Sequence, residues 1–315
     1  MMRMGAQRQP LANSRWHFTH GPIDIVIGAD GDADALRAAH EDAWTRFQPL
    51  LGELVAELPL LRQPITGPNR LRGVVASRMW HACVPFSSSY VTPMAAVAGS
   101  VAQELIACYR RTGVRRAWVN NGGDIALHLA PGESARVGLF ADLARFDPLT
   151  HRGPLQTDGQ FEVRAESPVR GIATSGWRGR SFSLGIADSV TVLAASASQA
   201  DAAATIIANA VDVQDEGIRR LPANECKDDS DLGNIPVTVD VAPLAPAQVQ
   251  HALAAGVLRA NALQRAGLIW SAALVCQGQW RVVQPLSSAV QGGHAALPPT
   301  FMQGHAVGAV GSVFA

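Results

Sequence analysis

The amino-acid sequence predicts an α+β fold built around a mainly antiparallel sheet. Segments with strand character and segments with helix character come in clusters along the chain and do not alternate strictly, which is typical of this class. Glycine-containing turns between apolar runs indicate hairpins. The chain has 315 residues, of which 48% are hydrophobic and 17% are charged. This is enough for one large domain or for two intimately packed halves.

The first half of the chain is expected to start with a short hairpin and to continue into helices. Apolar residues at helical spacing predict a long helix, which Pro49 would kink or divide. A second helix begins after Thr92, an N-cap residue, has Pro93 in its first turn and stops at Gly113. The expected elements are a loose polar arm at 1–14, strands at 16–19 and 23–27, a helix at 35–61, a segment of undecided type at 74–84, a helix at 93–111, and strands at 118–120, 125–129 and 136–140.

The second half adds a buried strand, two helices and a last hairpin. Ser198 is assigned as the N-cap of the helix that follows the buried strand, and Gly278 marks the turn of the last hairpin. The expected elements are a mixed loop at 142–159, a hairpin of strands 161–165 and 169–174, a strand at 190–195, a helix at 198–211, an exposed loop at 215–234, a strand at 237–241, a helix at 246–266, strands at 268–276 and 280–283, and a flexible tail at 286–315.

Charge and composition argue against several classes of function. The formal net charge is zero, and the densest basic cluster, arginines 110, 111, 115 and 116, is assigned to a helix end. Nucleic-acid binding requires clustered cations, so no such partner is expected. No apolar run is long enough to span a bilayer, and residues 1–14 lack the apolar core of a signal peptide. We therefore expect a cytoplasmic protein with no membrane partner, whose four cysteines are free thiols.

Residues 171–212 hold the densest set of candidate site residues. A small-residue loop, a buried strand and a helix N-terminus follow one another here, a combination that builds sites for anions and metals. Asp201 and Thr205 are four residues apart and so share a helix face. A carboxylate and a hydroxyl are hard oxygen ligands of the kind that magnesium accepts. The alternative, which spacing alone favours, is that Asp201 only caps the helix and Thr205 packs.

A second candidate is the turn formed by Asn121, Gly122, Gly123 and Asp124. Two glycines between strands permit positive φ angles and indicate a hairpin. They also let backbone N–H groups approach a ligand without an intervening side chain. Asn121 and Asp124 would then fix a polar group of that ligand. A plain tight turn is the simpler interpretation of the same residues.

Three blocks, residues 92–100, 120–125 and 171–212, together resemble the ApbE-like superfamily, and most closely its soluble, function-unassigned UPF branch. The resemblance runs from about residue 23 to 213 and extends toward 283. It implies one domain over 15–285, made of two T-fold-like α+β halves with a central site between them. The best-known members are FAD:protein FMN transferases, which use magnesium to cleave FAD and attach FMN to a Thr or Ser of a target flavoprotein.

The resemblance implies a ligand set for the metal and the nucleotide. Asp201 and Thr205 match the Asp-x-x-x-Thr that supplies magnesium ligands in the family, and Asp201 is thereby a catalytic candidate. The turn 121–124 matches a turn that lines the nucleotide pocket. The implied cofactor is Mg²⁺, and the implied ligand or substrate is FAD or a related nucleotide. We expect the turn and the helix start at Asp201 to meet around one cavity.

Further residues of the late block are candidates for phosphate contacts. Thr174, Ser175 and Gly176 match the family's Thr-Ser-Gly segment, whose hydroxyl and N–H groups could hold phosphate oxygens. Arg180 could contact a phosphate bidentately, or could simply face solvent. Asp188 is a candidate ligand or catalytic base, with capping of a loop as the alternative.

The sequence also departs from the transferases. They carry a Gly-His-Ile-x-Asp-Pro-x-Thr-Gly segment, and residues 179–188 have neither the histidine nor the Asp-Pro pair. Three hypotheses therefore stay open. The first is a magnesium-dependent enzyme acting on a flavin or nucleotide, including FMN transfer from FAD. The second is an enzyme of cofactor biosynthesis or one-carbon metabolism, such as a pterin pathway, and the third is a non-catalytic ligand-binding protein. A homodimer is an open expectation for each.

Overall fold

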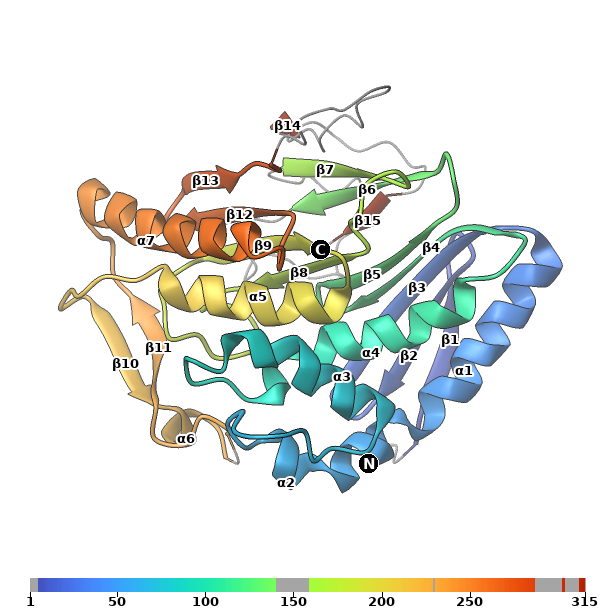
Figure 1. Cartoon of the computed structure of the whole chain (residues 1–315), viewed down its shortest axis with the longest axis horizontal. Helices are drawn as coiled ribbons and strands as arrows, with labels where there is room; N and C mark the ends of the chain where they lie inside the picture. Colours follow the sequence, from blue (N-terminus) through green and yellow to red (C-terminus); the bar gives the residue numbers. More distant parts are fainter. Residues whose placement is uncertain (1–4, 140–158, 229, 287–301, 304–311, 315) are drawn as a thin grey trace.

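A computed structural model describes residues 5–139, 159–228, 230–286, 302–303 and 312–314. In this part of the chain a nine-stranded sheet runs through the molecule, and helices cover one of its faces (Figure 1). The strand order is β1-β2-β3-β4-β5-β8-β9-β12-β13, and every neighbouring pair is antiparallel. The predicted α+β class with a mainly antiparallel sheet is confirmed. The finer division into two T-fold-like halves stays a prediction.

The described strands form three sheets. The large sheet contains β1 (Gln7–Leu11), β2 (Arg15–His20), β3 (Ile23–Gly31), β4 (Val114–Asn121), β5 (Asp124–Leu129), β8 (Gly171–Ser175), β9 (Ser189–Ala194), β12 (Ser271–Cys276) and β13 (Gln279–Val283). A smaller sheet, in the order β14-β7-β6-β15, contains β14 (Met302–Gln303), β7 (Gly159–Arg164), β6 (Ser134–Leu139) and β15 (Ser312–Phe314). The strands β10 (Ile218–Pro222) and β11 (Pro236–Val241) pair only with each other.

The helices come from every part of the described chain. The α-helices are α1 (Ala33–Ala56), α2 (Leu58–Leu61), α3 (Val74–Cys83), α4 (Val97–Ile106), α5 (Ala197–Ala210), α6 (Ala223–Cys226) and α7 (Pro246–Arg265). Short 3₁₀ turns are η1 (Val84–Phe86), η2 (Pro93–Ala96) and η3 (Ala107–Tyr109). Helices α4 and α5 lie side by side across the middle strands β5 and β8 (Figure 1).

The large sheet separates two hydrophobic cores, because successive side chains of a strand point to opposite faces. On β5, Ile125 and Leu127 belong to the core shared with the small sheet. Ala126 belongs to the core beneath the helices. Asp124 is two residues before Ala126 on the same strand, so its side chain is directed to the helix-covered face.

Helices α4 and α5 cross in very close contact at Gly99. A Cβ atom added to Gly99 would lie 2.3 Å from the carbonyl oxygen of Ala197 and 2.8 Å from the Cβ of Asp201. On the other side of α5, a Cβ on Gly171 of β8 would lie 2.0 Å from the carbonyl carbon of Ser196. The first turns of α5 are therefore held between α4 and the sheet, with glycine required on both sides.

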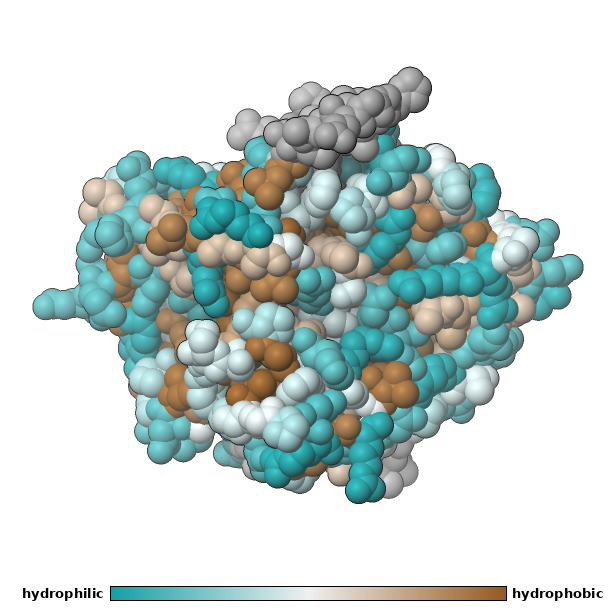
Figure 2. Space-filling view, viewed as in Figure 1, coloured by the Kyte–Doolittle hydropathy of each residue, from teal (hydrophilic) through white to brown (hydrophobic). Residues whose placement is uncertain are grey.

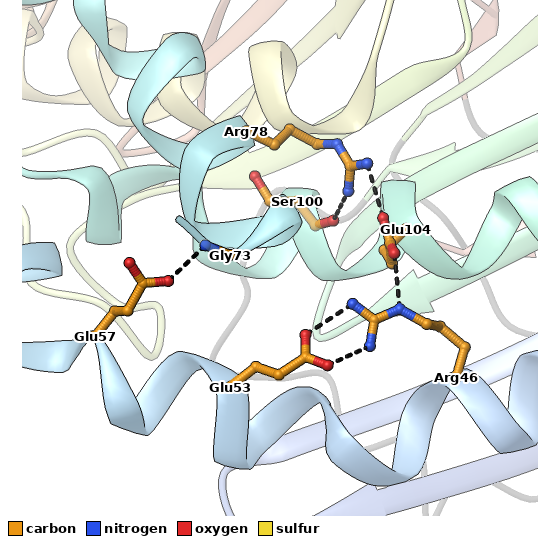
Figure 3. A network of polar contacts seen from close by, with 7 residues as sticks. All are labelled: Arg46, Glu53, Glu57, Gly73, Arg78, Ser100 and Glu104. Carbon is orange, nitrogen blue, oxygen red and sulfur yellow. Dashed lines mark hydrogen bonds and ion pairs between the residues drawn. The ribbon is translucent and has the colours of Figure 1, made fainter. Parts of the chain in front are cut away.

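A network of ion pairs joins α4 to α1 and α3 (Figure 3). The Glu104 carboxylate accepts hydrogen bonds from Arg46 Nε and Arg78 Nη2, both at 2.7 Å. Arg46 also donates two bonds to Glu53, and Arg78 Nη1 donates to the Ser100 carbonyl at 3.1 Å. Burial raises the pKa of Glu104, but the two arginines outweigh it and leave that pKa lowered. The network ties α4 to both α1 and α3.

Several elements near the N-terminus differ from the sequence prediction. The helix expected at 93–111 is divided into η2, α4 and η3, although the predicted cap is present, since Thr92 Oγ1 accepts from the Met94 N–H at 3.2 Å. Pro49 lies inside the continuous helix α1, and the break falls at Glu57 instead. The undecided stretch 74–84 forms α3 and the start of η1.

The hairpin predicted for 161–165 and 169–174 is wrong. β7 pairs with β6 in the small sheet, while β8 pairs with β5 and β9 in the large one. Alternation along a strand identifies its two faces but not its neighbours, so sequence proximity was misleading here.

Three other segments contain structure that the sequence did not indicate. Residues 7–11, which we placed in a loose arm, form β1 at the edge of the large sheet. Residues 215–234, expected as an exposed loop, contain β10 and α6, because β10 finds a distant partner in β11. In the expected tail, residues 302–303 and 312–314 pair with the small sheet. The loop expected at 142–159 lies outside the described residues apart from Gly159.

The exposed surface shows no large apolar area on the face drawn in Figure 2. Apolar residues there occur in small groups separated by hydrophilic ones. The large hydrophobic side chains that stay exposed in the described ranges are Val55, Val74, Tyr90, Leu258 and Leu286. Within those ranges, none of the helices combines the length and the apolar character needed to cross a membrane.

The close crossing at Gly99 leads to a stability prediction. Gly99→Ala should destabilise the protein by about 1–3 kcal/mol, because its methyl group overlaps backbone atoms of α5. Gly52→Ala is the matched control. Gly52 also lies within a helix and has no atom within 4 Å of the added Cβ, so alanine should stabilise by about 0.5–1 kcal/mol. Urea denaturation measures both changes, and a Gly99→Ala protein as stable as the wild type contradicts the close contact.

Candidate functional site

The candidate site begins at the predicted turn between β4 and β5. Asn121 and Asp124 are direct partners in the antiparallel register, and Gly122 and Gly123 form the two-residue loop with φ angles of +67° and +111°. Such angles favour glycine, which confirms the predicted hairpin. The Gly123 N–H donates to the Asn120 side-chain oxygen at 2.8 Å. The turn therefore fixes Asn121 and Asp124 side by side at one end of the hairpin.

Asp124 is buried beneath the helices, with 9% of the residue exposed. Its Oδ1 accepts a hydrogen bond from the Thr174 N–H of the neighbouring strand β8 at 3.3 Å. Burial raises the pKa of Asp124 to about 7, and the bond from Thr174 opposes this rise only in part. A carboxylic acid with such a pKa changes its charge near neutral pH.

The second carboxylate, Asp201, comes from α5. The N-cap of this helix is Ser196, whose Oγ accepts from the Gln199 N–H at 3.3 Å. The assignment of Ser198 as the cap is therefore wrong. Ser198 lies inside the first turn because the chain leaves its extended conformation two residues earlier. Asp201 consequently lies beyond the position from which it would cap its own helix.

Asp201 instead caps the neighbouring helix. Its Oδ2 accepts from the Gly99 N–H at 2.9 Å, and the Ala98 N–H also bonds to the carboxylate. These are N–H groups of the first turn of α4, whose own N-cap residue supplies no side-chain bond. In return, Gln103 of α4 accepts from the Ala197 N–H of α5 at 2.9 Å. Each helix thus supplies a hydrogen-bond acceptor for N–H groups at the N-terminus of the other. Asp201 is therefore a cap, but it caps α4 and not its own helix α5.

The structure brings Asp201 and Asp124 together, and we call them the carboxylate pair. Burial raises the pKa of Asp201, and the charge of Asp124 raises it further. The two N–H groups of α4 have the opposite effect. Within the described chain, no arginine, lysine or histidine forms a hydrogen bond or ion pair with either carboxylate. The two acids are therefore close enough for the charge of one to act on the other, and no cationic side chain of the described residues bonds to either.

The other predicted residues around the turn are also close by. The Asn121 Nδ2 donates to the Ala98 carbonyl at 3.1 Å, which ties the turn to the start of α4. Arg180 is exposed, and its Nη1 lies 3.5 Å from the position of a Cβ added to Gly122. Thr205, which is partly buried, follows Asp201 by one turn on the same face of α5.

The Thr-Ser-Gly segment, residues 174–176, contributes a backbone N–H group to the site. Thr174 contributes its N–H to Asp124, while its hydroxyl bonds to the Thr191 hydroxyl at 2.9 Å. Thr174 shares a face of β8 with Ile172, which packs toward the small sheet. The phosphate contact expected of its hydroxyl is therefore not available on the helix-covered face. Ser175 is partly buried, and Gly176 is packed so closely that a Cβ would lie 2.3 Å from the Asp188 carbonyl oxygen.

Asp188 holds a different part of the structure. Its Oδ2 accepts from the Gln277 N–H at 2.5 Å, and its Oδ1 is 3.7 Å from Arg178 Nε. Gln277 has a φ angle of +43° in the turn between β12 and β13, so the carboxylate stabilises a strained turn. Asp188 precedes β9, whereas α5 follows the other end of that strand. These contacts agree with the capping alternative; the catalytic role stays a prediction.

Sequence reasoning missed Cys83 of α3. This buried thiol lies close to Asp201, and burial, followed by the charge of Asp201, raises its pKa. It therefore stays protonated and is a poor nucleophile. Nothing in the local sequence marks Cys83, because only the packing of α3 against η2 and α5 brings it near the carboxylate pair.

Comparison with known families places the chain in one of them. A family model described as AbpE bacteria matches residues 6–282. The chain belongs to this family. This match and the relatives described below together confirm the resemblance to the ApbE-like superfamily and to its unassigned UPF branch.

The similar curated proteins are UPF0280 proteins of methanogenic archaea. The protein of Methanospirillum hungatei is 34% identical over 49% of this chain and 57% of its own length. That of Methanopyrus kandleri is 35% identical over 65% of this chain and 78% of its length. That of Methanothermobacter thermautotrophicus is 40% identical over 40% of this chain and 45% of its length. The chain thus spans between about half and three quarters of these relatives.

Two solved structures resemble the chain at low identity. One is the ApbE protein of Thermotoga maritima, with 12% identity, 65% of this chain and 86% of that chain covered, and a TM-score of 0.38. The other is the apo form of the flavinyl transferase ApbE of Pseudomonas stutzeri, with 14% identity, coverages of 90% and 96%, and a TM-score of 0.39. Likeness at this level carries no argument about function.

The buried acid Asp124 leads to a pH prediction for the metal-free protein. The folded protein retains the Asp124 proton up to about pH 7, whereas the unfolded chain loses it near pH 4. The contribution of the Asp124 proton to the free energy of unfolding is therefore fully present below about pH 4. It is lost as pH rises through about 7. Asp124→Asn should flatten this slope and stabilise the protein by about 1–3 kcal/mol at pH 8.

Urea denaturation between pH 5 and pH 8, in the presence of EDTA, measures the slope. Asp240→Asn, at an exposed position of β11, is the control and should keep the slope of the wild type. If Asp124→Asn keeps the wild-type slope of unfolding free energy against pH, the folded protein does not hold a proton on Asp124 in this pH range.

Proposed function

We propose that this chain is a magnesium-dependent enzyme that binds a flavin or another nucleotide through its diphosphate, with Mg²⁺ held by the carboxylate pair. The observation that carries the proposal is the meeting of Asp124 and Asp201 with no cationic side chain among the described residues to neutralise them. Two close carboxylates repel each other unless a proton or a cation lies between them. A divalent cation removes this repulsion.

The available ligands suit magnesium. The carboxylate pair and the Thr205 hydroxyl are hard oxygen donors, and among the described residues no group of three or more His, Cys, Asp or Glu forms a metal cage. Magnesium is typically bound by one or two carboxylates and completes its coordination with water and substrate phosphates. The limited donor set therefore supports joint binding of the metal and a phosphate-bearing ligand, not a tightly held metal alone.

Arg180 is placed to contact the phosphates of that ligand. Its guanidinium lies over the glycine turn, and the described chain gives it no hydrogen bond or ion pair. Arginine matches phosphate oxygens with two parallel N–H donors. The turn has no side chain at Gly122 or Gly123, so a ligand beside Arg180 can approach the backbone closely.

The chemistry that follows is cleavage of a diphosphate. Bound magnesium would supply positive charge against the charge that develops on the phosphate oxygens. Asp124 and Asp201 would orient the metal, and the N–H groups of α4 would keep Asp201 in position. The resemblance of the sequence to the ApbE-like superfamily, whose best-known members act on FAD, supports a flavin as the nucleotide. The narrower form of the proposal is FMN transfer from FAD to a protein. Residues 179–188 lack the transferases' histidine and Asp-Pro pair, so this transfer requires other residues in their place.

Isothermal titration with FAD, ADP and FMN, each with and without Mg²⁺, tests the proposal. We expect Mg²⁺ to tighten FAD and ADP binding at least about tenfold, a change of about 1.4 kcal/mol. FMN, which has one phosphate, should gain less. In Asp201→Asn the amide oxygen can still accept from α4, so the fold is kept while the metal effect is lost.

Asp240→Asn is again the control and should behave as the wild type. Binding that is indifferent to Mg²⁺, or a magnesium effect that survives in Asp201→Asn, contradicts the assignment of the metal site.

A further inference from the structure

A second candidate site lies at the other end of the β4–β5 hairpin. A surface cavity of about 520 Å³, wide open to solvent, lies there. Its lining includes Arg110, Arg111, Arg115 and His128. β4 has eight residues, so at about 3.3 Å per residue the cavity is about 25 Å from the carboxylate pair. It is therefore separate from the proposed metal site.

The charged side chains that line this cavity are all basic. Three of the lining residues are arginines, and none is acidic. Arg111 is paired with Asp42, and Arg115 is 3.7 Å from Glu133. The Arg110 side chain forms neither a hydrogen bond nor an ion pair within the described ranges. Within the described residues, no acidic side chain therefore neutralises the charge of Arg110.

Neighbouring groups respond to the charge of Arg110. Burial lowers the pKa values of His128 and Arg170, and the positive charge of Arg110 lowers both further. The Arg170 guanidinium donates only to backbone carbonyls, those of Ala165, Ser167 and Val169, in its hydrogen bonds. Glu166 acts on Arg170 in the opposite sense, but less than Arg110 does. The charge of Arg110 therefore acts on both of these neighbouring groups.

We propose that this cavity binds a small phosphorylated anion, of the diphosphate class, independently of the metal site. The cavity is open to solvent, which leaves room for a small hydrated anion beside Arg110, and arginine is the residue best suited to phosphate oxygens. Arg110 and Arg115 reach the ligand from the chain segment after α4. The site goes beyond the proposed function, because it needs neither magnesium nor the carboxylate pair.

Isothermal titration with inorganic pyrophosphate, in EDTA at low ionic strength, tests this site alone. The wild type should bind one pyrophosphate, and added salt should weaken the binding. Arg110→Ala should weaken it about tenfold, and Arg110→Ala combined with Arg115→Ala should weaken it further. Asp201→Asn should bind pyrophosphate as the wild type does, which separates this result from the test of the metal site.

Arg219→Ala is the control, since Arg219 is an exposed arginine on β10. It should leave the affinity unchanged. The proposal is overturned if the wild type does not bind pyrophosphate at millimolar concentration. It is equally overturned if Arg110→Ala binds as the wild type does, or if Arg219→Ala causes the same loss as Arg110→Ala.

Discussion

The close crossing of α4 and α5 is the constraint on which the rest of the structure depends. Gly99 lets the two helices approach until the Asp201 carboxylate reaches N–H groups of α4 and Gln103 reaches the first N–H of α5. Helix N-termini need such acceptors, so the contact stabilises both helices at once. Because β8 lies against the other side of α5, the same contact sets the height of Asp201 above the sheet. Asp201 is thereby brought to Asp124.

This arrangement gives Asp201 a structural role and, in our proposal, a chemical one as well. The bonds from α4 favour the charged form of Asp201, whereas burial and the neighbouring Asp124 oppose it. Leaving two acids together without a cation costs stability in the metal-free protein. Charged groups that lack a partner of opposite charge in the folded chain are characteristic of ligand-binding sites. Such sites lower the stability of the ligand-free protein in exchange for function. Among the described residues, the carboxylate pair shows this pattern, because no cationic side chain bonds to either acid.

Local sequence signals predicted the parts of the site that depend on local geometry. The two glycines at 122 and 123 predicted the turn, and the spacing of Asp201 and Thr205 predicted their shared helix face. Features that depend on distant contacts were missed. The helix capped by Asp201 is set by the packing of α4, and the face taken by Thr174 is set by the pairing of β8 with β5 and β9. The choice between Ser196 and Ser198 as cap depends on where β9 ends, which composition does not determine.

The most direct test of the central claim is the location of a bound divalent ion. Crystals grown with ADP and Mn²⁺, a scatterer that can replace Mg²⁺ at oxygen ligands, allow the ion to be found from its anomalous signal. We predict one strong peak between the carboxylates of Asp124 and Asp201, within reach of the Thr205 hydroxyl. A well-ordered carboxylate pair with no peak between them, or a peak only at other acidic residues, would contradict the account.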